Sequence, residues 1–256
     1  MTEIFIAIFN LFKLDFNSFV NILISFPTDM TWLFFLFFCF FCILLFLKFF
    51  GEIGIYAYTV IAIIVANIQL LKIVEFSFFI NPIPLGTALF ASTFLCTDIL
   101  AEHFGHRKAK INIFIGFVGF LTFTIMMLFT LGFKPFDIEV QKNLINVFLP
   151  LPIFFAASMI AYMISQFFDV WVFIKISNLT NKRFLWLRNN LSTIISSLID
   201  NTVFSIFAWL IFNPNPETLT TIIGFIFGTY VLRIFIAILD TPFLYSAKFF
   251  ILNHQK

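Results

Sequence analysis

The chain has 256 residues, of which 61% are hydrophobic and 11% are charged, and its formal net charge is +2. A soluble globular domain carries about 25% charged residues, so this composition excludes a soluble enzyme, a disordered segment and a nucleic-acid-binding domain. What remains is a polytopic membrane protein that contacts the lipid bilayer and no nucleic acid.

Seven apolar runs follow one another along the chain without period-two alternation. A bilayer core of about 30 Å takes about 20 helical residues, whereas a barrel strand takes about 10 alternating ones. The runs therefore predict an all-α membrane bundle of about seven transmembrane helices. The expected spans are Trp32–Leu47, Ile53–Leu71, Ile83–Leu100, Ile111–Phe133, Val147–Phe173, Trp186–Phe212 and Leu219–Leu244. The third span begins among helix-breaking residues, namely Asn81, Pro82, Pro84 and Gly86.

The domain organisation is expected to be simple. Residues 32–250 form a single transmembrane domain, and residues 251–256 form a cytoplasmic tail. In the N-terminal part, residues 1–31, the run Phe5–Phe12 is apolar, but no Lys or Arg precedes it, which argues against a cleavable signal peptide. We expect an interfacial or re-entrant segment there.

Basic residues in the expected loops predict the orientation, because cytoplasmic loops carry an excess of Lys and Arg. One set of loops holds Lys48, Arg107, Lys108, Lys110, Lys175, Lys182, Arg183, Arg188, Lys248 and Lys256. The other set holds Lys13, Lys72, Lys134 and Lys142. Seven spans place the larger set on one side, so we expect an integral protein of the plasma (inner) membrane with its N-terminus outside and its C-terminus in the cytoplasm.

The start of the sixth span carries a polar helical face. Asn189, Thr193, Ser196, Ser197 and Asp200 share this face at 100° per residue. An Asp at the centre of a membrane helix costs about 2.5 to 3.5 kcal/mol, so we expect Asp200 to face the bundle interior at a functional site. Contacts between helices are the alternative role for the two serines.

The seventh span carries Arg233 and Asp240, which lie seven residues apart and therefore on one face. Two roles for Arg233 remain open. It forms an internal ion pair with Asp240 or Asp200, or it donates to a substrate carbonyl and tunes Asp200.

The end of the third span combines carboxylates and imidazoles. Asp98 and Glu102 are i, i+4 neighbours, and His103 and His106 follow. These types bind divalent metals, but the four side chains do not point the same way. We favour a gating carboxylate pair before a helix end at Gly105 and expect no metal and no cofactor.

Other spans add polar groups at membrane depth. The fifth contributes Gln166 and Asp169, and the second contributes Asn67 and Gln69. Together with the polar face of the sixth span, they predict a hydrogen-bonding cavity. No Ser–His or Cys–His pair lies at a common depth, so the expected chemistry is solute recognition and not catalysis.

Several of these stretches resemble the queuosine precursor transporter family, also described as vitamin-uptake-transporter-like integral membrane proteins. They are ANIQ at Ala66–Gln69, STFLCTDILAEHFG at Ser92–Gly105, SQFFDVWVF at Ser165–Phe173, WLRNNLSTIISSLID at Trp186–Asp200 and LDTPFLY at Leu239–Tyr245. The resemblance covers Ile53 to Phe250 in order. One departure is Phe104, where the family motif usually has Tyr.

The resemblance implies import of a 7-deazaguanine precursor for tRNA modification: the cyano base, the aminomethyl base or queuine. A transporter for another nucleobase or vitamin is the alternative. It also implies a core of six helices like the substrate-binding components of energy-coupling-factor transporters, with the first span as an addition. A separate energising module and a homo-oligomer stay open as partners.

For such a solute, the predicted substrate-binding residues are Asn67, Gln69, Gln166, Asn189, Asn190, Asp200 and Arg233. Asp200 is expected to bind the ring N–H and the exocyclic NH₂, and Arg233 the carbonyl. The predicted gate or proton sites are Asp98, Glu102, Asp169 and Asp240. Most of the 44 Phe are expected to face lipid, and Phe94, Phe167 and Phe204 are candidates to stack on the base.

Overall fold

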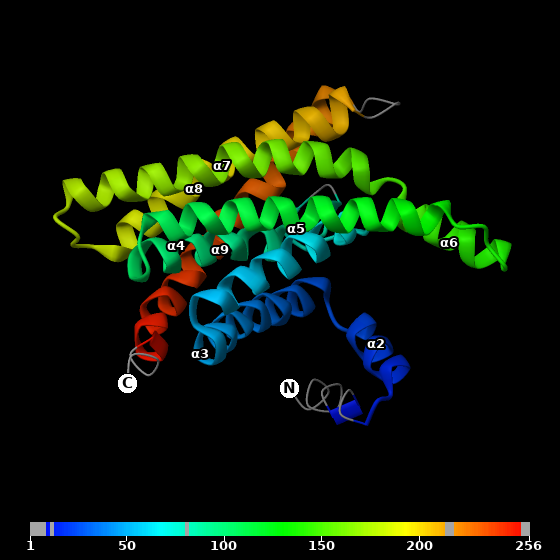
Figure 1. Ribbon diagram of the computed structural model, residues 1–256, viewed down its shortest axis with the longest axis horizontal. Helices are drawn as coiled ribbons and strands as arrows, with labels where there is room; N and C mark the ends of the chain where they lie inside the picture. The colour runs from blue at the N-terminus through cyan, green and yellow to red at the C-terminus, as the bar shows by residue number, and fades with distance from the viewer. Residues whose placement is uncertain (1–8, 11–12, 80–81, 213–217, 252–256) are drawn as a thin grey trace.

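The computed structural model is a bundle of long helices (Figure 1), and it describes the chain except for residues 1–8, 11–12, 80–81, 213–217 and 252–256. The helices are α2 (Phe16–Ser25), α3 (Thr28–Gln69), α4 (Thr87–His103), α5 (His106–Gly132), α6 (Ile138–Phe148), α7 (Leu151–Leu179), α8 (Leu185–Ser205) and α9 (Leu219–Ile251). A π-helical turn, η1 (Ile206–Ile211), continues α8. Two short strands, β1 (Ile73–Val74) and β2 (Ile83–Pro84), pair antiparallel.

The first two expected spans both lie in α3, which reverses direction at Gly51 (Figure 1). Gly51 has φ 60° and ψ −137°, a conformation that glycine adopts readily. The rings of Phe46 and Tyr58 are 6.1 Å apart, whereas twelve residues of straight helix would separate them by about 18 Å. α3 is therefore two membrane-length arms joined by a tight turn.

Long apolar segments confirm the predicted all-α membrane bundle. In the described part of the chain, five are long and apolar enough to cross a membrane: Thr28–Gln69, His106–Gly132, Ile138–Leu179, Leu185–Ile211 and Leu219–Ile251. α4 is shorter, at 17 residues, and every residue from Thr87 to Ala101 is buried. α4 is thus the central helix, and the others shield it from lipid.

The third expected span begins later than predicted, at Thr87 and not at Ile83. Ile83 and Pro84 form β2 instead, and Gly86, with φ 105°, turns the chain into α4. A Cβ at Gly86 would lie 2.6 Å from the carbonyl oxygen of Ala66. The helix-breaking residues before the third span therefore form a short strand and a glycine turn, which packs against the end of α3. Asn81 lies outside the described residues.

The fifth expected span is also divided. Asp137 is the N-cap of α6, and its carboxylate accepts hydrogen bonds from the backbone N–H groups of Glu139 and Val140. α7 is a separate helix that begins after Pro150. The two helices do not join, because proline has no N–H to donate and its ring clashes with the preceding helical turn. α6 projects beyond the bundle (Figure 1).

The N-terminal helix α2 lies beside the bundle, and none of its residues is buried (Figure 1). Asp15 caps it by accepting a hydrogen bond from Ser18 at 3.1 Å, and this contact lowers the pKa of the Asp15 carboxyl. The apolar run Phe5–Phe12 falls mostly outside the described residues.

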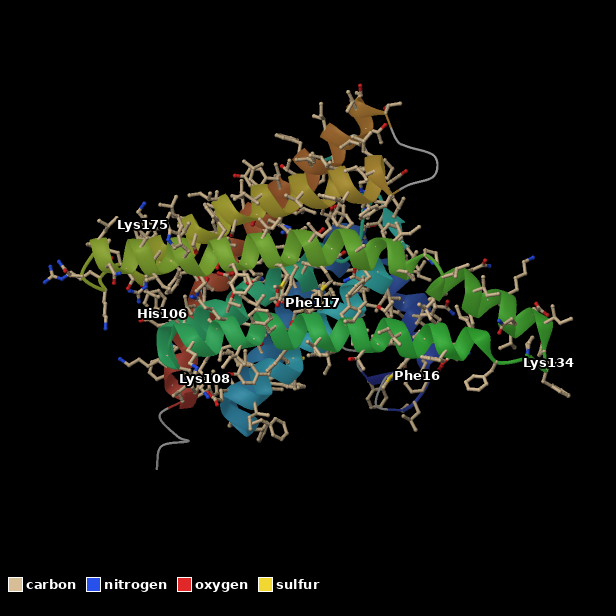
Figure 2. All side chains as sticks on the ribbon, turned by 45° about the horizontal axis from the view of Figure 1, so that its top comes forward. Phe16, His106, Lys108, Phe117, Lys134 and Lys175 are labelled. Carbon is tan, nitrogen blue, oxygen red and sulfur yellow. The ribbon has the colours of Figure 1, made fainter. Side chains whose placement is uncertain are left out.

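Basic residues gather at one end of the bundle, which we call the basic end. Figure 2 shows His106, Lys108 and Lys175 there and Lys134 at the opposite end. The α4–α5 turn and the α7–α8 turn lie at the basic end, and the β1–β2 hairpin lies at the other, because successive long helices run in opposite directions. The chain thus alternates between the two ends as the sequence predicts.

Candidate functional site

A small cavity of about 50 Å³ lies inside the bundle toward the β1–β2 hairpin, and we call it the pocket. Its polar lining residues are Thr87, Ser158, Asp200, Asn201, Ser205, Thr229 and Arg233, and its aromatic ones are Phe90, Phe204, Trp209 and Phe225. They come from α4, α7, α8, η1 and α9. Apolar walls with a few convergent polar groups are typical of small-molecule sites.

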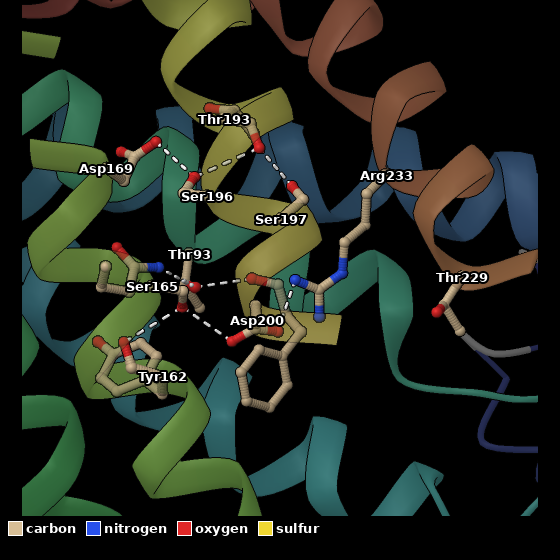
Figure 3. A network of polar contacts seen from close by, with 12 residues as sticks. Thr93, Tyr162, Ser165, Asp169, Thr193, Ser196, Ser197, Asp200, Thr229 and Arg233 are labelled. Atoms are coloured by element: carbon tan, nitrogen blue, oxygen red, sulfur yellow. Dashed lines mark hydrogen bonds and ion pairs between the residues drawn. The ribbon is translucent and has the colours of Figure 1, made fainter. Parts of the chain in front are cut away.

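Asp200 and Arg233 form the charged centre of the pocket (Figure 3). Arg233 Nη1 lies 2.6 Å from Asp200 Oδ2, which is an ion pair, although the angle does not suit a hydrogen bond. Ser165 Oγ donates to Asp200 Oδ1 at 2.8 Å. The guanidinium also lies 5.8 Å from the ring centre of Phe90 and 6.0 Å from that of Phe94. Of the two roles left open for Arg233, the structure thus has the pair with Asp200.

Two other predicted substrate-binding residues stand behind the pocket wall. Asn67 accepts a hydrogen bond from Ser158 at 2.7 Å and donates to the carbonyl of Ile63 at 2.8 Å. Gln166 donates to Thr93 Oγ1 and accepts from Thr97 Oγ1, both at 3.0 Å. Both amides therefore have partners already, and they fix helix positions around the pocket.

Gln69 is half-buried at the last residue of α3 and does not line the pocket. The structure therefore places it beside the hairpin end of the bundle and not with Asp200.

Asn189 and Asn190 lie far from the pocket, near the basic end. Asn189 is eleven residues before Asp200 on α8, about 16 Å along the helix axis. Its Nδ2 donates to Asp240 Oδ1 at 2.9 Å, and Asn190 Nδ2 donates to Thr241 Oγ1 at 2.8 Å. These bonds tie α8 to α9, so the predicted substrate-binding set is divided between two levels.

A second polar level contains Asp98 on α4, Asp169 on α7 and Asp240 on α9, and we call these three the carboxylate cluster. All three are buried. Asp169 Oδ1 accepts a hydrogen bond from Ser196 at 2.9 Å (Figure 3). The carboxyl of Asp98 lies against that of Asp169. The structure therefore brings together three of the four predicted gate or proton residues.

The fourth, Glu102, lies at the basic end in an ion pair with Arg188. Arg188 also donates to Ser177 Oγ at 2.9 Å and lies 5.2 Å from the ring centre of Phe173. Arg188 is 1% exposed, so counting it among the loop cations was wrong. An arginine close to the end of a span looks like a loop residue in sequence, and only the fold shows that it points inward.

Sequence reasoning missed polar residues of the pocket lining such as Asn201, Ser205 and Thr229. It also missed Ser165, which donates to Asp200 but is not part of the lining. An isolated serine or threonine in an apolar helix is a weak signal because it commonly bonds its own backbone. Of the three aromatic candidates, Phe204 lines the pocket and Phe94 lies under Arg233. Phe167 packs on Phe114, with ring centres 5.4 Å apart, and is not in the lining.

The region that carries both polar levels matches a known family. Residues 84–247 match the family model described as "Putative vitamin uptake transporter". The chain belongs to this family of vitamin uptake transporters. With its long apolar helices, the transporter is an integral, multi-pass membrane protein.

A curated relative extends the similarity over most of the transporter. The "Probable queuosine precursor transporter" of Bacillus subtilis (strain 168) is 33% identical over 227 residues, which span 88% of this chain and 96% of the relative. No solved structure matches the transporter. The family match includes the charged centre of the pocket and the carboxylate cluster, and it leaves out Asn67 and Gln69 on α3.

Proposed function

We propose that this transporter imports a 7-deazaguanine precursor of queuosine and does not catalyse a reaction. The observation that carries the proposal is the 33% identity, over 88% of this chain and 96% of the relative, to a protein named "Probable queuosine precursor transporter". The pocket supports it, because a buried carboxylate and a buried guanidinium stand side by side among aromatic rings.

The chemistry of the pocket suits such a base. A deazaguanine presents a ring N–H and an exocyclic NH₂ to one carboxylate, and Asp200 has two oxygens for them. Its carbonyl accepts from a cation such as Arg233. The flat ring packs on an aromatic side chain such as Phe90 or Trp209. On binding, Asp200 and Arg233 would each contact the base in place of the contact that they now make with each other.

The described pocket is a closed form. A volume of about 50 Å³ holds a few water molecules and not a bicyclic base. Binding therefore requires the lining to move apart. That lining includes Pro84 of β2 and Gly86 in the turn into α4.

We place the basic end in the cytoplasm, the N-terminus outside and the transporter in the plasma (inner) membrane. The support is the excess of Lys and Arg at that end. The pocket then lies toward the outer side, where an imported solute is captured. We further propose that α2 is an interfacial or re-entrant helix, because it has no buried residue, and that residues 32–250 form one transmembrane domain.

Uptake in a host lacking its own transporter and its own precursor synthesis tests the function. Queuosine in tRNA is measured after feeding each of the three precursors, with wild type, Asp200→Asn and the surface control Asp137→Asn. We expect queuosine with wild type and the control, and none with Asp200→Asn at equal membrane levels. Absence of queuosine with all three precursors for wild type contradicts the proposal.

The family description as a vitamin uptake transporter favours one alternative, a different solute. Competition separates the two. We expect excess unlabelled precursor to abolish uptake of labelled precursor, and biotin, riboflavin or guanine to leave it unchanged. Strong inhibition by a vitamin would assign the pocket to that vitamin instead.

A further inference from the structure

Buried acids outnumber buried bases inside the bundle. Among the described residues, the buried charged side chains are Asp98, Asp169, Asp200, Asp240, Arg188 and Arg233. Arg233 pairs with Asp200, and Arg188 pairs with Glu102. In the described part of the chain, the carboxylate cluster thus has no cation within ion-pair distance. Three ionised carboxylates there would be costly, because each charge loses its hydration.

The contact between Asp98 and Asp169 lacks a hydrogen-bond donor. Two ionised carboxylates can only accept hydrogen bonds. Neither oxygen of Asp98, nor Oδ2 of Asp169, receives a hydrogen bond from a residue that the structure describes. One added proton makes one carboxyl a donor to the other and removes one unit of buried charge, as in other carboxylate pairs that share a proton.

We propose that Asp98 and Asp169 together bind one proton, and that this proton is the coupling ion for import through the pocket. The inference rests on the function proposed above and deepens it by naming the energy source. It assigns the driving force to the proton gradient and not to a separate energising module.

The groups around the pair favour a bound proton. The charged groups that act on Asp98 are Asp169 on α7, Asp240 on α9 and Arg188 on α8. On its own helix, the thiol of Cys96 lies two residues earlier, on another face. Two of the charged groups are carboxylates, and the charge of Arg188 is already balanced by Glu102. Since Asp240 has a donor in Asn189, the pair of Asp98 and Asp169 is where a donor is missing.

The proton site and the pocket are joined through two helices. On α7, Ser165 donates to Asp200 and lies one turn before Asp169. On α8, Ser196 donates to Asp169 and lies one turn before Asp200. A base that draws Asp200 away from Ser165 therefore shifts the same two helix turns that hold the carboxyl pair. Occupancy of one site then changes the affinity of the other, as linkage requires.

Glu102 provides the route to water at the basic end. It lies one turn beyond Asp98 on α4, and 26% of its side chain is exposed. In one cycle a proton arrives from outside with the base, an O–H bond forms on one carboxyl of the pair, and the same bond breaks when the proton leaves toward the basic end. One proton enters and one leaves, so charge and atoms balance.

Purified transporter in liposomes tests the coupling, with the membrane potential clamped at zero and a pH gradient of one unit, acid outside. One proton per neutral base predicts about a tenfold accumulation of the labelled cyano precursor. Asp98→Asn and Asp169→Asn should each abolish accumulation while keeping exchange of labelled for unlabelled base. The introduced amide is a permanent donor like the protonated carboxyl, so we expect both variants to fold. Asp137→Asn, an exposed Asp at the start of α6, should accumulate like wild type.

Each result decides a separate question. Equal accumulation with and without the gradient in wild type overturns the proton proposal, and so does tenfold accumulation by both Asn variants. If one variant fails to fold, the other variant and the wild-type gradient response still decide. Failure of the purified wild type to bind any of the three precursors contradicts the proposed function instead.

Discussion

At the scale of single residues, the ion pair of Asp200 and Arg233 places two opposite charges in the interior of the bundle. Both side chains are nearly fully buried, at 2% and 6% exposure. Breaking a buried pair by removing one partner destabilises a protein by about 3 to 5 kcal/mol, because the other charge stays uncompensated. The two residues should therefore depend on each other for stability and act together in binding.

A double-mutant cycle checks this dependence. We expect Asp200→Asn and Arg233→Met each to lower the thermal unfolding temperature of the purified transporter, and the double variant to lie closer to wild type than the sum of the singles. All three should lose precursor uptake. Additive effects on the unfolding temperature would show that the pair contributes no coupling energy.

At the scale of elements, the turn into α4 is the most constrained connection. Gly86 and Gly105, which flank α4, both have positive φ, at 105° and 93°. A Cβ at Gly86 would meet the carbonyl of Ala66 at 2.6 Å, while a Cβ at Gly105 would have nothing within 4 Å. The same substitution therefore meets backbone strain at both glycines and a collision only at Gly86.

Alanine at the two glycines separates strain from collision. We expect Gly105→Ala to cost about 1 to 3 kcal/mol, from the strain of its positive-φ backbone alone, and Gly86→Ala to cost clearly more. The measurement is unfolding of the purified variants in detergent, with uptake as a second readout. Equal losses would mean that the approach of Gly86 to α3 does not constrain the fold.

Sequence patterns predicted the helical elements better than the site. Apolar length alone locates the spans, because a membrane leaves few alternatives to helices. The tight reversal at Gly51 fits inside the gap left between two expected spans. Two helices begin later than expected, α4 after Gly86 and α7 after Pro150. At these positions the backbone preferences of glycine and proline outweigh the apolar run.

The site was predicted only in part, and the reason is depth. The periodicity of a helix predicts which way Asn189 and Asp200 point. One face of a helix extends through the whole membrane, however, so its residues lie at several depths, here at the pocket and near the carboxylate cluster. Which level a residue serves depends on its partners on other helices, such as Arg233 for Asp200 and Asp240 for Asn189. Single-residue cost arguments correctly indicated that Asp98, Asp200 and Asp240 face the bundle interior.

At the scale of the whole molecule, the two ends differ in charge, and orientation follows from this difference. We expect single cysteines at Lys108 and Lys182, in a variant without the three native cysteines, to react with a membrane-impermeant thiol reagent only after the cells are opened. A cysteine at Lys134 should react in intact cells. Labelling of the Lys108 position from outside would reverse the proposed topology.

The burial of α4 has a consequence for how the protein is made. A helix with no lipid-facing side gains little from entering the bilayer alone, and α4 carries Asp98 into it. Its packing partners include α3 and α5, its neighbours in the chain, and also α9, which is synthesised much later. During synthesis α4 therefore packs first against α3 and α5, and the side that contacts α9 stays uncovered until α9 has been made.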